Sequence, residues 1–110
     1  MSNLFDESML AWQVVRPDVA TDVFGRALQE GKVKVVLTRV APGGKFRAHR
    51  DAYAHLFYFL SGTGIVEVGE QKREARAGVV VQIEAGEAHA YENTGTDDLV
   101  LISMNLPSEK

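Results

Sequence analysis

Short runs of hydrophobic residues, separated by turns rich in glycine, recur along most of this chain. The runs are of strand length and rich in valine, isoleucine and aromatic residues, which is typical of β-strands. The segments between them contain Gly, Pro, Asn and Asp, which favour turns. We therefore expect a hairpin over residues 22–40 and strands at 33–40, 45–51, 55–60, 65–68, 72–77, 79–83, 89–93 and 99–106. Many short strands of this kind predict an all-β sandwich or barrel.

Alternation along a strand indicates which side chains share a face. The strand at 55–60 (HLFYFL) is apolar on both faces, so we expect it to be covered on both sides. The strand at 72–77 (KREARA) is polar and is expected at an edge, where charge discourages unwanted pairing. Three sets of residues are each expected to share one face: Arg47, His49 and Asp51; His55, Phe57 and Phe59; and His89, Tyr91 and Asn93.

The first 20 residues predict no single element. Hydrophobic residues from Leu4 to Trp12 suit a short amphipathic helix, whereas residues 11–15 (AWQVV) equally suit a strand, and Pro17 ends either one. We therefore expect residues 1–20 to form an N-terminal arm and residues 21–110 to form one barrel domain.

Composition narrows the class of protein. A chain of 110 residues, 45% hydrophobic and 25% charged, suits one globular domain with a single core. The net charge of -3 gives no general attraction to phosphate backbones or anionic lipid, so nucleic acid is not an expected partner.

Localisation follows from what the sequence lacks. No apolar run approaches the roughly 20 residues that span a bilayer, and the N-terminus lacks the basic segment of a signal peptide. The absence of cysteine excludes disulfides and thiolate metal ligands. We therefore expect a cytoplasmic protein without membrane contacts.

All three histidines, His49, His55 and His89, lie in two glycine-flanked segments, and Asp51 stands between the first two. If the sheet closes into a barrel with alternate residues pointing inward, these four side chains converge. Three imidazoles and a carboxylate suit one divalent ion such as Mn, Fe, Co, Ni or Zn, with coordination positions left for water or substrate. The alternative is a polar cluster that bonds only to itself or binds an organic ligand directly.

The spacing of these residues resembles the two sequence motifs of the cupin family. The first motif of that family is Gly, five residues, His-x-His, three or four residues, Glu, six residues and Gly. The same gaps here separate Gly43, His49, Asp51, His55 and Gly62, and those of the second motif separate Gly78, Glu84, Gly86, His89 and Asn93. The resemblance covers roughly residues 33–106. It implies a small single-domain cupin, an all-β jelly-roll barrel (a double-stranded β-helix).

Three residues depart from the family pattern. Asp51 stands where the family has its second His, His55 where it has Glu, and Glu84 replaces the Pro before Gly86. The set therefore still contains three histidines and one carboxylate, and the resemblance still implies one divalent metal ion. Because an aspartate is shorter than an imidazole, Asp51 is either a ligand itself or an acceptor that orients a ligating histidine.

Four further residues are expected to line the pocket: Arg47, Phe57, Phe59 and Tyr91. Arg47 would either meet an anionic substrate or form an ion pair at the rim. By resemblance we expect a mononuclear metal enzyme of the dioxygenase, isomerase or lyase type, acting on a small organic substrate that is anionic if Arg47 meets it. The alternative is a non-catalytic module that binds or senses a small, sugar-like molecule.

A second interpretation of the site reads His49, Asp51 and His89 as the 2-His-1-carboxylate triad of non-haem Fe(II) oxygenases. The 2-oxoglutarate branch of those enzymes usually has a basic residue soon after the distal His, and here the first is Lys110. We therefore exclude that branch but not other oxygenases.

We also expect a homodimer, because the two-sided apolar strand at 55–60 and the apolar arm offer more surface than one small barrel buries.

Overall fold

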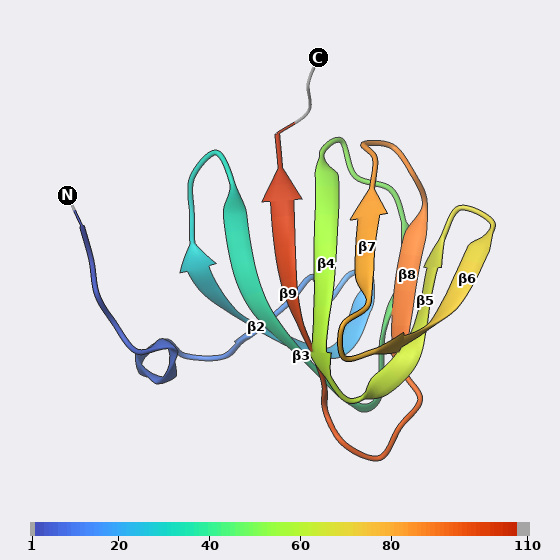
Figure 1. Cartoon of the computed structure of the whole chain (residues 1–110), viewed down its shortest axis with the longest axis horizontal. Coiled ribbons are helices and arrows are strands. Elements are labelled where there is room, and N and C mark those ends of the chain that lie inside the picture. Colours follow the sequence, from blue (N-terminus) through green and yellow to red (C-terminus); the bar gives the residue numbers. More distant parts are fainter. Residues whose placement is uncertain (1, 108–110) are drawn as a thin grey trace.

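The computed structural model describes residues 2–107. Met1 and residues 108–110, which include Lys110 and the ends of the predicted arm and barrel domain, lie outside the described residues. The described part consists of a short 3-10 turn and nine strands (Figure 1): η1 (Glu7–Met9), β1 (Gln13–Val14), β2 (Ala20–Gln29), β3 (Lys34–His49), β4 (Ala54–Ser61), β5 (Thr63–Val68), β6 (Gln71–Arg76), β7 (Val80–Ile83), β8 (His89–Asn93) and β9 (Leu99–Leu106).

The strands form one antiparallel sheet that curls into a barrel with one open side (Figure 1). The strand order is β6-β5-β8-β3-β9-β4-β7, with β2 beside β3 and β1 beside β2. The first half of β3 pairs with β9, from Lys34↔Asn105 to Val40↔Leu99, and its second half pairs with β8. The strands beside β9 form one wall of the barrel and those beside β8 form the other. Because β3 belongs to both walls, the sheet must bend along it. The all-β barrel predicted from the sequence is confirmed, and β6 lies at an edge as expected.

The prediction that residues 41–44 end one strand and begin another is wrong, because β3 runs through them without a break. Gly43 has a φ of +80°, which bends the strand at little cost because glycine has no Cβ. At Gly44 a Cβ would lie 2.9 Å from the carbonyl oxygens of Thr21, Asp22 and Ala41. Glycine therefore allows β2 to approach β3 closely at this bend instead of ending the strand.

A β-bulge in β3 changes which side chains point inward. Phe46 pairs with Tyr91 and His49 pairs with His89, so that three steps along β3 match two steps along β8. The extra residue reverses the alternation of side chains. Phe46 and His49 therefore share the inner face, while Arg47 is exposed. The predicted common face of Arg47 and His49 is corrected by this bulge.

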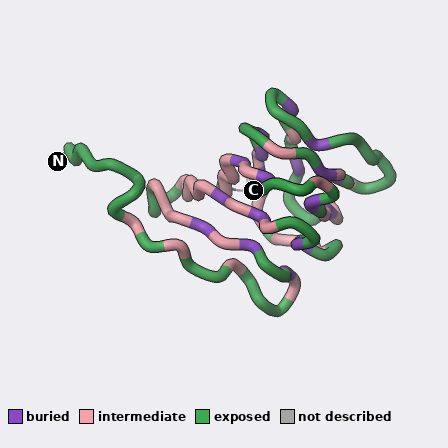
Figure 2. The backbone as a smooth tube through the Cα atoms, turned by 90° about the horizontal axis from the view of Figure 1, so that it is seen from below, coloured by how far each residue is buried: buried purple, intermediate pink, exposed green. Residues whose placement is uncertain are grey.

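The core fills the space between the two walls of the barrel. Figure 2 shows buried residues recurring along the strands and exposed ones in the arm and turns. The largest fully buried side chains come from β2, β3, β4, β8 and β9: Val23, Val40, Phe59, Asn93, Leu99 and Leu101. Alternate residues of β4 point into this core, whereas Tyr58 and Leu60 on its other face are 43% and 40% exposed. The expected cover on both faces of β4 is thus absent within the described part of one chain.

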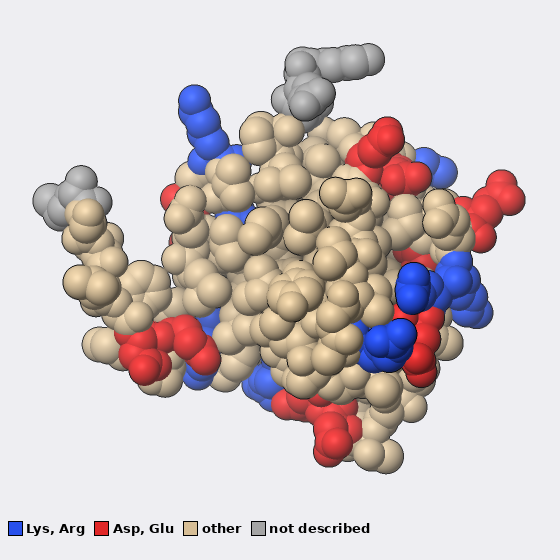
Figure 3. Space-filling view, in the orientation of Figure 1, with Lys and Arg blue, Asp and Glu red and all other residues tan. Residues whose placement is uncertain are grey.

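Figure 3 shows that the centre of the face over β4, β7 and β9 carries no charged side chains. Three exposed large hydrophobic residues lie on it: Tyr58, Leu60 and Val80. The N-terminal arm leaves the barrel beside β2 (Figure 1), and its Trp12 ring packs under the guanidinium of Arg26 at 4.2 Å. None of the helical segments in residues 2–107 is long and apolar enough to cross a membrane.

Candidate metal centre

The candidate metal ligands come from three neighbouring segments of the barrel. His49 ends β3, Asp51 lies in the loop that follows, His55 lies near the start of β4, and His89 begins β8. The bulge in β3 places His49 directly opposite His89. The backbone N–H of Gly86 donates a hydrogen bond of 2.7 Å to the carbonyl oxygen of Asp51, which ties the loop after β3 to the turn before β8.

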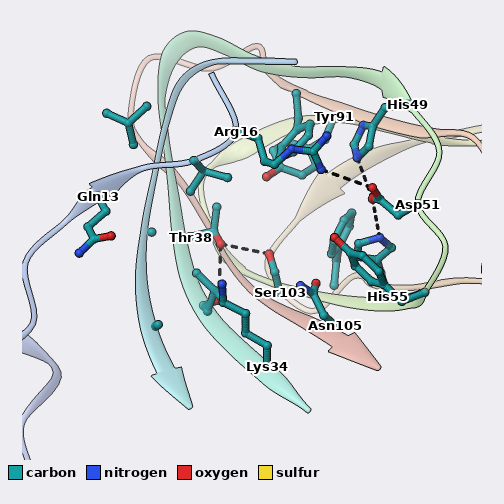
Figure 4. Close-up of a pocket in the computed structure, with 18 of the residues that line it drawn as sticks. Gln13, Arg16, Lys34, Thr38, His49, Asp51, His55, Tyr91, Ser103 and Asn105 are labelled. Atoms are coloured by element: carbon teal, nitrogen blue, oxygen red, sulfur yellow. Dashed lines mark hydrogen bonds and ion pairs between the residues drawn. The ribbon is translucent and has the colours of Figure 1, made fainter. Parts of the chain in front are cut away.

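The three imidazoles converge on one oxygen of the Asp51 carboxylate. Oδ2 of Asp51 lies 2.9 Å from Nε2 of His55, 3.1 Å from Nε2 of His49 and 3.6 Å from Nε2 of His89. Figure 4 shows His49 and His55 pointing toward this carboxylate from two sides. The donor atoms of His49, Asp51 and His89 all lie within 4.8 Å of one another. The structure therefore brings together the four residues that the sequence singled out.

Hydrogen bonds on the far side of two rings orient their donor atoms. Nδ1 of His49 lies 2.8 Å from the carbonyl oxygen of Arg47, and Nδ1 of His89 lies 2.9 Å from that of Glu87. Because a carbonyl oxygen only accepts, each Nδ1 carries a proton and donates it. In the neutral ring, Nε2 then presents a lone pair to the Asp51 carboxylate. The lone pairs of His49 and His89 and the negative oxygen of Asp51 repel one another. This repulsion is removed when a cation or a proton lies between these atoms.

The electrostatics of the cluster favour the protonation states that bind a metal. Burial lowers the pKa of His55 and outweighs the hydrogen bond and charge of Asp51, which act in the opposite direction. Burial likewise lowers the pKa of His89, against the hydrogen bond to Glu87. Burial alone would raise the pKa of Asp51, but the hydrogen bond from His55 and the electrostatic effect of His49 and His55 bring it below its ordinary value. Neutral imidazoles and an ionised carboxylate are the forms that coordinate metal ions.

The distances also suit a shared ion. Nitrogen and carboxylate oxygen donors lie about 2.0–2.2 Å from a bound zinc ion, so two donors are about 3.4 Å apart in tetrahedral geometry and about 3 Å apart at a right angle. The N···O distances here run from 2.9 to 3.6 Å. Nitrogen and oxygen donors without sulfur favour a borderline divalent ion over a soft one. The residues present therefore fit the metal that the motif spacing implies.

A cavity of about 480 Å³ extends from this cluster toward the arm. Phe57 and Tyr91 line it together with Phe46, whose ring is stacked on that of His49 with the ring centroids 4.5 Å apart. Burial raises the pKa of the Tyr91 hydroxyl, so that it remains protonated. Further along the cavity lie three polar side chains, Thr38, Ser103 and Asn105 (Figure 4), of which the first two share a hydrogen bond of 3.0 Å.

Two residues predicted to line the pocket are placed elsewhere. Arg47 is exposed, and its Nη2 donates a hydrogen bond of 2.8 Å to the carbonyl oxygen of Asp18. Phe59 is fully buried in the core, beyond Phe57 along the inner face of β4. Among the described residues that line the cavity, neither is present. Arg47 points away from the cavity because the bulge in β3 reverses the alternation of side chains. Phe59 does not line the cavity because it lies deeper in the barrel, in the core.

Several cavity residues were not anticipated. Ser103 and Asn105 follow Leu99 and Leu101 at alternate positions of β9, so polar residues on the inner face of an apolar strand were an available signal. Arg16 had no such signal, because a turn of the arm brings it to the cavity. Asn93 of the second motif plays a structural part: its Nδ2 donates to the carbonyl oxygens of Val40 and Asp97, at 2.9 and 2.8 Å.

Comparisons with known proteins agree with this architecture. A family model described as a cupin domain matches residues 36–105. No curated protein matches the chain in sequence.

Similar solved structures show the same fold at low sequence identity. A predicted oxalate decarboxylase from Thermotoga maritima has a TM-score of 0.86 and 20% identity, over 96% of this chain and 99% of that one. The polyketide cyclase RemF from Streptomyces resistomycificus has a TM-score of 0.87 and 19% identity, over 99% of this chain and 81% of that one. KdgF from Halomonas sp. has a TM-score of 0.80 and 18% identity, over 94% of each chain.

Proposed function

Because the chain belongs to the cupin family, we propose that it is a mononuclear metal enzyme that acts on a small organic molecule in its cavity. His49, Asp51, His55 and His89 would hold one divalent ion of Mn, Fe, Co, Ni or Zn. The similar structures are named as a decarboxylase and a cyclase, so the fold alone does not choose the reaction. Dioxygenase, isomerase and lyase chemistry are the classes we propose.

One observation carries this proposal. Three Nε2 atoms face a single carboxylate oxygen, and two of these rings have their Nδ1 proton committed to a backbone carbonyl. Such an arrangement leaves lone pairs directed at a shared point, and a divalent cation is the group that this point suits.

The ion, when bound, would polarise an oxygen of the substrate or activate a water molecule. The protein supplies the rest. Phe46, Phe57 and Tyr91 form an apolar wall beside the cluster, which limits the access of water. Thr38, Ser103 and Asn105 offer hydrogen bonds to the far end of a ligand. Asp51 stays ionised, because its pKa lies below its ordinary value, and it would act either as a ligand or as the base that accepts a proton from the substrate.

The test is the metal content of protein purified without a histidine tag and without added metal. Elemental analysis should find about one Mn, Fe, Co, Ni or Zn per chain, and His55→Ala should lose most of it. Loss of a metal-binding side chain or of its orienting partner typically lowers affinity about 10- to 100-fold or more. Glu92→Gln is the matched control, because Glu92 is an exposed residue of β8 between inward-facing neighbours. No metal on isolation and none on titration would contradict the proposal.

Asp51→Asn refines the assignment. Metal affinity lowered by no more than about 100-fold in this variant would make Asp51 a residue that orients the histidines, and complete loss of the metal would make it a ligand. Both outcomes are compatible with a metal enzyme, and they separate the two roles open to a short aspartate at this position.

A non-catalytic binding module is the second candidate. The observation that favours it is the closure of the polar cluster on itself, since Asp51 already contacts three imidazoles and Arg16. A binding module would retain its ligand in the presence of chelators, whereas the enzyme would lose activity on metal removal and regain it with one particular ion.

We also propose that the chain is a cytoplasmic homodimer. The uncharged face over β4, β7 and β9 exposes Tyr58, Leu60 and Val80, and the arm exposes Leu4 and Met9. Burying such surface against a second copy is favourable.

A further inference from the structure

Arg16, from the N-terminal arm, reaches the wall of the cavity beside the metal cluster. Its Nη1 lies 3.3 Å from Oδ1 of Asp51, a residue 35 positions further along the chain. The other oxygen of the same carboxylate is the one that faces the three imidazoles. Figure 4 shows Arg16 on the same side of the cavity as Tyr91 and His49. A permanent positive charge therefore lies next to the point where an ion would bind.

The turn that carries Arg16 is held in an unfavourable backbone conformation. Arg16 has a φ of +39°, a region that non-glycine residues rarely adopt. Its carbonyl oxygen accepts hydrogen bonds from the N–H groups of Val19 and Ala20, at 3.0 and 2.8 Å. Arg47 secures the turn to β3, because its backbone N–H donates to the carbonyl oxygen of Val19 at 2.8 Å. Backbone strain that the surroundings maintain tends to occur at functional sites.

The guanidinium is oriented but not saturated. Nε and Nη2 donate to the two oxygens of Asp18, at 3.3 and 3.2 Å, and Nη1 donates to Asp51. These distances are at the long end of the hydrogen-bond range, and Nη1 and Nη2 each have a second N–H. The Arg16 side chain is 41% exposed. A carboxylate entering the cavity would meet donors in the planar arrangement that binds two oxygens at once.

The remaining charges of the cavity wall are compatible with an anion near Arg16. Glu30 and Lys34 lie in the wall as one acidic and one basic residue. The charge of Asp51 is shared between Arg16 and the imidazoles, so it repels an anionic ligand less than an unpaired carboxylate would.

We propose that Arg16 is a specificity-determining residue that binds the carboxylate of the ligand, and that the ligand class of this cavity is therefore small carboxylic acids. The proposal rests on the proposed function, since it names the chemistry of the molecule that would occupy the same cavity. It also assigns a role to the arm, because Arg16 lies outside the residues matched by the family model.

The experiment compares acids with their neutral amides. Benzoate and butyrate are titrated against the full-length protein, beside benzamide and butyramide, by calorimetry or ligand-observed NMR. Wild-type protein should bind each acid at least about tenfold more tightly than its amide, because a hydrogen bond to a charged group is stronger than one between neutral groups. Arg16→Gln should abolish this preference, and Arg16→Lys should retain part of it. Arg76→Gln, the same change of charge on the exposed edge strand β6, should leave it intact.

Arg16→Gly separates binding from folding. Glycine adopts a φ of +39° without strain, so this variant should lose the preference for acids while its thermal midpoint stays within a few degrees of wild type. Equal binding of acids and amides by wild-type protein, or an unchanged preference in Arg16→Gln, would overturn the inference.

Metal content measured on the same samples keeps the two proposals distinct. An Arg16-dependent preference for acids in protein that takes up no metal would support this inference and contradict only the proposed metal enzyme. Metal uptake without any preference for acids would overturn this inference alone.

Discussion

Oδ2 of Asp51 and Nε2 of His55 lie 2.9 Å apart, although one residue lies in a loop and the other in β4. Asp51 lies two residues beyond the end of β3, and the hydrogen bond from the backbone N–H of Gly86 holds it beside the turn before β8. The carboxylate therefore contacts every histidine of the chain. The electrostatic coupling between these two residues leads to the first prediction.

Asp51→Asn should lower the pKa of His55 further. Burial already lowers the pKa of His55, and the hydrogen bond and charge of Asp51 are the main effects that oppose it. Removing the charge leaves the effect of burial with less opposition. NMR titration of the imidazole signals in metal-free protein measures the shift, with Glu92→Gln as the control. A pKa of His55 that rises in Asp51→Asn would contradict the arrangement described here.

The stability of the metal-free protein should fall as the pH decreases below about 6.5. The ordinary pKa of histidine is 6.5, and both His55 and His89 have lower values in the folded protein. The unfolded chain therefore binds protons before the folded one does, and each proton bound favours unfolding. Asp51, whose pKa lies below 3.8 in the fold, adds a loss of the same sign at lower pH.

Denaturant unfolding between pH 5 and 8, in the presence of a chelator, measures this dependence. The free energy of unfolding should be nearly constant above pH 7 and decrease below it. The decrease should be smaller in His89→Gln, which removes one of the two titrating groups. Stability that increases toward pH 5 would contradict the lowered pKa values.

Gly62→Ala should destabilise the fold strongly, whereas Gly31→Ala should not. Gly62 has a φ of +84°, and a Cβ there would lie 2.3 Å from the backbone oxygen of Asp98. Strain of this kind costs about 1–3 kcal/mol before any clash is counted, so we expect a loss of about 2 kcal/mol or more. No atom lies within 4 Å of a Cβ built on Gly31. Chemical denaturation of the two variants compares these costs, and similar values for both would contradict the structure at the β4–β5 turn.

Deletion of residues 1–12 should weaken the proposed dimer. Leu4 is fully exposed and Met9 is 79% exposed in the single chain, so both would gain by burial on a second copy. Light scattering over a concentration series measures the mass. Trp12→Ala is the control, because it removes the packing on Arg26 and Arg39 and leaves the exposed arm residues in place. An unchanged mass after the deletion would count against this role of the arm.

Much of the fold could be predicted because strands and turns are recognised from residues that are close together in the sequence. The period of two in β4, β8 and β9 indicated which residues point inward, and the structure buries His55, Phe57 and Phe59 together as expected. The glycines that punctuate the strands marked the turns, since positive φ angles occur at Gly62, Gly69, Gly78 and Gly86. The three histidines and Asp51 could be predicted as a cluster in the barrel interior because their spacing along the chain is also local information.

The predictions for the face of Arg47 and for residues 41–44 were wrong because a bulge and a bend in a strand cannot be recognised from the alternation of polar and apolar residues. A bulge adds one residue to β3, and every inference about the face of Arg47 reversed with it. Two glycines that read as the end of a strand instead bend it, because the strand has to pass from one wall of the barrel to the other.

The sequence by itself determined the strands, the barrel and the three histidines with their aspartate, because side-chain periodicity and motif spacing depend on near neighbours in the chain. Only the tertiary structure decided that Arg16 instead of Arg47 reaches the cavity, and that Oδ2 of Asp51 meets all three imidazoles. These contacts join residues far apart in the chain through a turn, a bulge and a bent strand. Their geometry depends on how the whole sheet closes, which no local pattern records.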